Sequence, residues 1–164
     1  MKKIVFFDRD ETLIKDVPYL NDPSLIELFD DTISTLLKLK SKGYEFIIVT
    51  NQSGVPRGLI TEEQLAQVHD ELLRVLEAQG IEILSIYYSP HLPDSNHPSR
   101  KPNPGMLLQA FDEFDIDKSQ SLMVGDKISD GKAGLNAGLK SFILNKKLDG
   151  CVTLNNLSQL LDYI

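Results

Sequence analysis

The sequence predicts an α/β fold in which a doubly wound, mostly parallel sheet forms the middle of three layers. Short apolar runs alternate with longer amphipathic stretches, and this alternation is typical of β-α-β units. Acidic and polar residues directly follow several of the apolar runs, as they do where parallel strands end at a ligand-binding edge. No stretch between the expected elements is long enough for a separate cap domain, so we expect residues 1–164 to form one domain.

The strands are recognised as short apolar runs that stop at polar or small residues. Ile4–Phe7 stops at Asp8, and Phe46–Val49 stops at Thr50. Further runs of this kind end near Tyr87, at Gly125 and at Leu144. The strands are therefore expected near residues 3–7, 45–50, 83–88, 121–125 and 140–144.

Helices are expected near residues 31–42, 62–79, 104–114, 130–137 and 156–162. The second helix has the clearest limits, because Thr61 and Gln64 form a capping-box pattern and Gly80 provides a stop. The apolar residues of this helix recur at helical spacing and predict a face packed on the core: Leu65, Val68, Leu72, Leu73, Val75 and Leu76.

Acidic residues follow two of the strands and predict a metal site. Asp8 and Asp10 are spaced i, i+2, so both side chains point to one face of the strand end, where they repel each other unless a cation lies between them. Asp126 follows another strand after Gly125. Carboxylates that converge at one sheet edge are typical of a Mg²⁺ site. Asp130 either orients this site or caps a helix, and a solvated Asp-Arg-Asp turn is the alternative for the first cluster.

Two further strand ends supply groups that bind phosphate. Thr50 and Asn51 can donate hydrogen bonds to phosphoryl oxygens, although a simple polar turn is the alternative. Lys101, followed by Pro102, can neutralise both a carboxylate and a phosphoryl group, whereas a solvated basic loop is the plainer interpretation. The order Asp-x-Asp, Thr, Lys, Gly-Asp along the chain favours phosphoryl chemistry.

These motifs resemble those of the haloacid dehalogenase (HAD) superfamily of phosphatases. More narrowly, the chain is similar to the group that contains D-glycero-D-manno-heptose 1,7-bisphosphate phosphatase and the histidinol-phosphate phosphatase domain. The resemblance spans nearly the whole chain in four stretches, which are residues 7–14, 49–58, 100–106 and 123–130. It implies a Rossmann-like HAD core without a cap domain.

The resemblance also implies roles for individual residues. Asp8 would be the nucleophile and Asp10 the general acid/base, while Thr50 and Lys101 would bind the phosphoryl group. The implied Mg²⁺ ligands are Asp8, the backbone carbonyl of Asp10, and Asp126. The residues implied to face or support the substrate are Asn51, Gln52, Ser53, Arg57, Arg100 and Lys127. The resemblance gives Arg9 no clear role. The alternative interpretation is a buried cation that pairs with a neighbouring carboxylate.

The expected reaction is a Mg²⁺-dependent, two-step phosphoryl transfer through an aspartyl-phosphate at Asp8. The expected substrate is a small sugar phosphate, with a heptose 1,7-bisphosphate ranked first and histidinol phosphate as the alternative. A receiver-like phosphorylation switch and an inactive ligand-binding relative are the alternatives from other classes. The receiver is disfavoured because its phosphate-accepting Asp lies in mid-chain, whereas Asp8 comes first here.

Two positions depart from the pattern of the group. Glu11 stands where most superfamily members carry Gly, which puts full activity in question. Relatives also commonly carry a zinc site, Cys-x-His and Cys-x-Cys, before the Arg-Lys-Pro stretch. Here the matching stretches are Ser89-Pro90-His91 and His97-Pro98-Ser99. Hydroxyl groups replace thiolates poorly as zinc ligands, so we predict no zinc, although His91 and His97 remain as metal-binding side chains.

Composition is consistent with a small cytoplasmic enzyme. The net charge of −7 disfavours nucleic acid and anionic membranes as partners, and a small phosphorylated metabolite is expected instead. Cys151 is the only cysteine, which suits a reducing compartment. No apolar run approaches the roughly 20 residues that cross a bilayer. Lys15–Asp22 and Ser89–Ser99 are expected to wall an open cleft, and the oligomeric state is left open.

Overall fold

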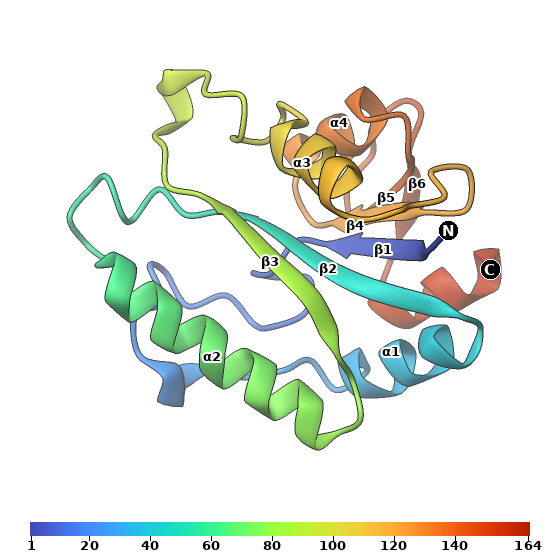
Figure 1. Ribbon diagram of the computed structural model, residues 1–164, viewed down its shortest axis with the longest axis horizontal. Helices are drawn as coiled ribbons and strands as arrows, with labels where there is room; N and C mark the ends of the chain where they lie inside the picture. Colours follow the sequence, from blue (N-terminus) through green and yellow to red (C-terminus); the bar gives the residue numbers. More distant parts are fainter.

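Six parallel strands form the centre of the molecule in the computed structural model, which describes residues 1–164 (Figure 1). The strands are β1 (Lys3–Phe7), β2 (Tyr44–Asn51), β3 (Ile83–Ser89), β4 (Leu122–Gly125), β5 (Lys140–Leu144) and β6 (Val152–Leu154). Their order in the sheet is β3-β2-β1-β4-β5-β6, and every neighbouring pair is parallel. The expected doubly wound sheet is therefore confirmed, and the chain reverses its direction of winding between β1 and β4.

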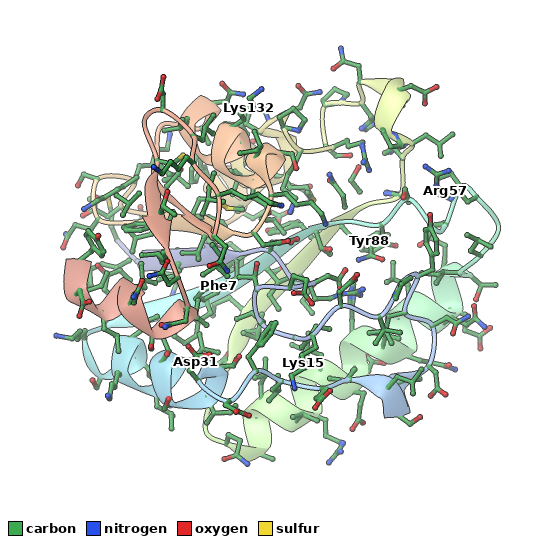
Figure 2. The ribbon with its side chains drawn as sticks, turned by 180° about the vertical axis from the view of Figure 1, so that it is seen from behind. Phe7, Lys15, Asp31, Arg57, Tyr88 and Lys132 are labelled. Atoms are coloured by element: carbon green, nitrogen blue, oxygen red, sulfur yellow. The ribbon has the colours of Figure 1, made fainter.

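Helices cover both faces of the sheet. The helices α1 (Thr32–Ser41) and α2 (Glu62–Ala78) lie on one face, and α3 (Gly105–Glu113) and α4 (Ile128–Asn136) lie on the other (Figure 1). Figure 2 shows Asp31, before α1, and Lys132, on α4, on opposite sides of the sheet. Alternate residues of β1 supply the two cores, since Val5 and Phe7 pack in one cluster and Ile4 and Phe6 in the other.

The start of α2 follows the predicted capping box. The backbone N–H of Gln64 donates to Thr61 Oγ1, the N–H of Thr61 donates to Gln64 Oε1, and both distances are 3.0 Å. Gly80 ends the segment with a φ of 80°, a conformation that glycine adopts without strain. The buried side chains of α2 are Leu65, Val68, His69, Leu72 and Leu76. His69 is thus a polar residue within an otherwise apolar face.

Two elements differ from the sequence prediction. The strand β6 was not predicted, because three residues are too short to give an apolar run. The helix expected at 156–162 is instead a 3₁₀ helix, η3 (Leu157–Tyr163). Its buried residues Leu157 and Leu160 are three apart, which matches the three residues per turn of that helix. Two shorter 3₁₀ turns, η1 (Pro23–Leu25) and η2 (Pro93–Ser95), lie in loops.

No helix of the structure has both the length and the apolar character needed to cross a membrane.

Candidate active site

Acidic side chains from two strand ends meet at the carboxyl edge of the sheet. Asp8 follows β1, and its backbone N–H donates to Val124 O on β4 at 3.0 Å. Asp126 follows β4, and Asp130 lies in the first turn of α4. One carboxylate oxygen from each of Asp8, Asp126 and Asp130 lies within 4.8 Å of the others. The two strand ends therefore converge as the sequence predicted.

Lys101 lies in the middle of this acidic cluster. Its Nζ donates to Asp8 Oδ1 at 2.8 Å, to Asp130 Oδ1 at 2.6 Å and to the carbonyl of Val49 at 2.8 Å. These three bonds use all three N–H donors of the ammonium group. Its side chain is only 3% exposed. Lys101 is thus held against Asp8 and Asp130 as their buried counter-ion.

Asn51 fixes the backbone of Lys101. Its amide Nδ2 donates to the carbonyl of Lys101, and the N–H of Lys101 donates to Asn51 Oδ1, both at 3.0 Å. The side chain of Asn51 therefore positions the lysine, a role that sequence analysis did not foresee. Its remaining surface lines the cleft described below.

Asp130 performs both of the roles that the sequence left open. Its Oδ1 accepts from Lys101, and its Oδ2 accepts the N–H groups of Asp126 at 3.1 Å and Lys127 at 2.9 Å. These two bonds cap the start of α4. Gly125 is required here by close approach, because a Cβ atom at that position would lie 2.3 Å from the Asp130 side chain.

The charges of the cluster favour a divalent cation. Burial raises the pKa of Asp8, but the nearby Lys101 and hydrogen bonds outweigh it, so the pKa falls below its usual value. Burial and the charge of Asp8 raise the pKa of Asp126 to about 8. Two ammonium groups, Lys101 and Lys127, face three carboxylates. The residues present therefore fit Mg²⁺, whose positive charge would relieve the repulsion that raises the pKa of Asp126.

The carboxylate of Asp10 is paired with Arg9. Arg9 Nε donates to Asp10 Oδ1 at 3.0 Å, and Nη2 donates to Oδ2 at 3.1 Å. The third nitrogen of the guanidinium group, Nη1, lies 3.0 Å from His69 Nε2 on α2. Arg9 is 1% exposed, so the alternative of a buried cation paired with a carboxylate holds. The carboxylate of Asp10 is not among the three clustered carboxylates, although Asp10 lies only three residues beyond the end of β1.

A cleft of about 260 Å³ opens beside Asp10. Five of the predicted site residues line it, and these are Asp10, Asn51, Gln52, Ser53 and Lys127. The segment 16–20 lines its other side, which agrees with the expected wall at Lys15–Asp22. The loop Ser89–Ser99 contributes no lining residue. The cleft is therefore walled by one of the two expected segments.

The predicted residues Thr50, Arg57 and Arg100 do not line this cleft. Thr50 is buried at the end of β2, where Oγ1 accepts from Gln52 Nε2 at 2.9 Å. Arg100 is half-buried and donates from Nη1 to the carbonyl of His91 at 3.0 Å. Burial and the charge of Arg57 lower the pKa of Arg100. Arg57 itself is exposed at the edge of the molecule (Figure 2).

Sequence analysis missed two side chains near the site. Thr12 Oγ1 donates to Asp126 Oδ1 at 3.4 Å. His69 contacts Arg9. The sequence feature that could have identified His69 is its position on the apolar face of α2, beside Val68 and Leu72. A polar residue on a buried stripe must find a partner inside the protein, so its position predicts a partner but does not name it.

The loop before Arg100 is held by polar side chains. Ser89 Oγ lies 2.8 Å from Ser99 Oγ, which in turn lies 2.8 Å from His97 Nδ1. The rings of His91 and His97 stack with their centroids 3.6 Å apart. The positions that match the thiolate ligands of relatives are thus joined to one another by hydrogen bonds.

Comparison with solved structures defines the class of protein. The crystal structure of a D,D-heptose 1,7-bisphosphate phosphatase from B. bronchiseptica, complexed with magnesium and phosphate, matches with a TM-score of 0.88 and 26% identity over 99% of both chains. A putative HAD-like phosphatase from Mesorhizobium loti matches with a TM-score of 0.85 and 33% identity, covering 98% of this chain and 83% of the other. The fold and the acidic centre are those of a HAD-type phosphatase.

Sequence comparison narrows the class to a family. A family model described as polynucleotide kinase 3 phosphatase matches residues 3–143. A D-glycero-beta-D-manno-heptose-1,7-bisphosphate 7-phosphatase from Pasteurella multocida (strain Pm70) is 41% identical over 152 residues, covering 89% of this chain and 83% of the relative. The chain belongs to the HAD phosphatase family that contains these heptose-bisphosphate phosphatases, and the resemblance seen in its motifs is confirmed.

Proposed function

We propose that this chain hydrolyses a phosphomonoester of a heptose 1,7-bisphosphate, with Mg²⁺ as cofactor and an aspartyl-phosphate on Asp8 as intermediate. The observation that carries the proposal is the contact of Lys101 Nζ with Asp8 beside Asp126, within a chain of this family. A buried carboxylate whose pKa is lowered stays ionised and is available as a nucleophile at neutral pH.

Asp8 and Asp10 divide the chemistry between them. An oxygen of Asp8 attacks phosphorus in line, and the bond from phosphorus to the sugar oxygen breaks. Asp10 gives a proton to that oxygen and then takes one from the water that releases phosphate. Lys101, with Thr50, stabilises the charge on the phosphoryl oxygens.

We assign the Mg²⁺ to Asp8, the backbone carbonyl of Asp10, and Asp126. When bound, the ion supplies positive charge next to the phosphoryl oxygens. The crystal structure of the B. bronchiseptica phosphatase was obtained with magnesium and phosphate, which supports this choice of ion. We propose that the Ser89–Ser99 loop holds no zinc, since its hydroxyl groups replace thiolates poorly as ligands.

The substrate-binding residues are assigned from the cleft and the cations around it. Gln52, Ser53 and Lys127 line the cleft with Asn51, and the cations Arg57 and Arg100 lie outside its lining. Such groups suit a small polar substrate with more than one anionic group. With a net charge of −7, the chain is proposed to act as one domain in the cytoplasm, on a small metabolite rather than on nucleic acid or a membrane.

Phosphate release from a set of substrates tests the proposal. The set contains both anomers of the heptose 1,7-bisphosphate, histidinol phosphate, an oligonucleotide with a 3′-phosphate, and p-nitrophenyl phosphate, each with Mg²⁺ and with excess EDTA. We expect the largest kcat/KM for one heptose anomer and no turnover with EDTA. A larger kcat/KM for histidinol phosphate or the oligonucleotide would reassign the substrate. A long-lived phosphoprotein formed from acetyl phosphate would instead indicate a switch.

A further inference from the structure

We propose that His69 is a positioning residue for catalysis, because it holds Arg9 and Arg9 in turn holds Asp10. This inference rests on the proposed role of Asp10 as general acid. It assigns a function in the reaction to a side chain on α2 that does not line the substrate cleft.

The contact between Arg9 and Asp10 fixes the carboxylate at two points. Arg9 Nε and Nη2 reach the two oxygens of Asp10 at 3.0 and 3.1 Å, which is the fork geometry of a guanidinium on a carboxylate. The only other side chain that donates a hydrogen bond to this carboxylate is Gln52, whose Nε2 lies 3.4 Å from Oδ2. The orientation of Asp10 therefore depends mainly on the orientation of Arg9.

His69 supplies the third point of support. Arg9 Nη1 lies 3.0 Å from His69 Nε2, and a guanidinium has only donors, so Nε2 must accept and the proton must lie on Nδ1. Burial and the charge of Arg9 lower the pKa of His69 to about 3, which agrees with a neutral ring. The imidazole is therefore a fixed acceptor and takes no part in proton transfer.

The position of His69 in the fold makes this support rigid. His69 is 7% exposed and belongs to the buried face of α2, with Val68 in the hydrophobic core. The α2 backbone fixes the ring, the ring fixes the Arg9 fork, and the fork fixes the Asp10 carboxylate. A general acid must lie within hydrogen-bond reach of the leaving oxygen. A small loss of orientation of the Asp10 carboxylate therefore lowers the rate of proton transfer.

The inference predicts an effect that depends on the leaving group. Benzyl phosphate and p-nitrophenyl phosphate are similar in size, but benzyl alkoxide needs a proton when the bond to phosphorus breaks, whereas nitrophenolate does not. The comparison uses kcat/KM, which reports the steps up to departure of the leaving group. It does not require a sugar substrate, so it stands even if the heptose assignment fails.

Two variants form a matched pair. In His69→Gln the amide oxygen reaches about as far as Nε2 and can still accept from Arg9, whereas the shorter amide of His69→Asn cannot. For His69→Asn we expect kcat/KM to fall roughly 10- to 100-fold with benzyl phosphate and less than about threefold with p-nitrophenyl phosphate. His69→Gln should recover most of the loss.

The control is Val68→Ala, which weakens the packing of α2 next to His69 without removing a partner of Arg9. It should lower both kcat/KM values by the same small factor. Equal losses for both esters in His69→Asn, or no recovery in His69→Gln, would overturn the inference. If His69→Asn does not fold, His69→Leu, which fills the volume without an acceptor, replaces it in the same comparison. Failure of the proposed function itself would show separately, as absence of Mg²⁺-dependent turnover in the parent.

Discussion

Lys101 Nζ lies 2.8 Å from Asp8 Oδ1 and joins two segments that are 93 residues apart in the chain. The same ammonium group donates to Asp130, so one lysine connects the end of β1 with the start of α4. Both carboxylates are buried with it. The two carboxylates depend on this one buried ammonium group, because its removal would leave them uncompensated.

Replacing the lysine should therefore destabilise the protein. We expect Lys101→Met to lower the free energy of unfolding by about 3–5 kcal/mol, since Asp8 and Asp130 lose their buried counter-ion. Urea denaturation measures the change. The double variant Lys101→Met/Asp130→Asn carries one uncompensated charge fewer and should regain part of the loss. If Lys101→Met alone is as stable as the parent, the ammonium group contributes no net stability.

Removing the nucleophile should abolish turnover while leaving the fold intact. We expect Asp8→Asn to reduce kcat by roughly 10⁴-fold or more, because a neutral amide does not attack phosphorus. Phosphate release and a thermal melt measure activity and folding together. Asp112→Asn, an exposed position on α3, is the matched control and should keep full activity. Comparable loss in both variants would contradict the assignment of Asp8.

Magnesium should stabilise the parent protein through Asp126. Binding to the native state raises the melting temperature. Burial and the charge of Asp8 raise the pKa of Asp126 to about 8, and a cation beside the two carboxylates would relieve the repulsion between them. In Asp126→Asn the repulsion is absent, so this variant should melt no lower than the parent without Mg²⁺ and gain little when Mg²⁺ is added. Calorimetry with and without EDTA measures both. The assignment of Asp126 fails if Mg²⁺ raises both melting temperatures equally.

The backbone at Glu11 is strained, and two substitutions separate the effect of this strain from the effect of losing the carboxylate. Its φ is 59°, a conformation that costs a residue with a Cβ atom about 1–2 kcal/mol, and its Oε1 accepts from the N–H of Asp16 at 2.6 Å. Glu11→Ala and Glu11→Gly both lose the carboxylate but differ in the Cβ atom. We expect the Gly variant to be more stable than the Ala variant by about 1 kcal/mol in urea denaturation. The reverse order would show that the backbone is not strained there.

His69 should make stability depend on pH. Its pKa is lowered from 6.5 to about 3 in the folded protein, so below pH 6.5 the unfolded chain binds a proton that the folded chain does not. The contribution of His69 to the free energy of unfolding is therefore complete above that pH. It decreases as the pH falls toward 3, with a slope of up to about 1.4 kcal/mol per pH unit. His69→Gln should lack this contribution, whereas His97→Gln, at an exposed position, should keep it. Parallel profiles for the parent and His69→Gln would contradict the buried neutral ring.

The strands and the acidic edge of the sheet were predictable because they depend on local patterns. Apolar runs such as Ile4–Phe7 mark buried strands, and parallel strands bring their ends to one edge. Asp8, Lys101 and Asp126 could therefore be placed near one another without a structure. The strand β6 was not predictable from its three residues, because it is defined by its pairing with β5 and not by a local apolar run.

Contacts that depend on the orientation of side chains could not be predicted from the sequence. Nothing local shows that Asp10 turns toward Arg9 rather than toward Asp8, or that the amide of Asn51 binds the Lys101 backbone. His69 and Arg9 are 60 residues apart, and their contact depends on how α2 packs against the sheet. Nothing local shows either that the carboxylate of Glu11 accepts a hydrogen bond from the N–H of Asp16.

The loop that joins Ser89, His97 and Ser99 by hydrogen bonds has a consequence for oxidative stress. Peroxide converts thiolates to sulfenic acid, and metal sites built on thiolates lose their ion when this happens. Hydroxyl and imidazole groups do not undergo that reaction. The segment that supports Arg100 is thus built from side chains that keep their chemistry when a cell loses its reducing power.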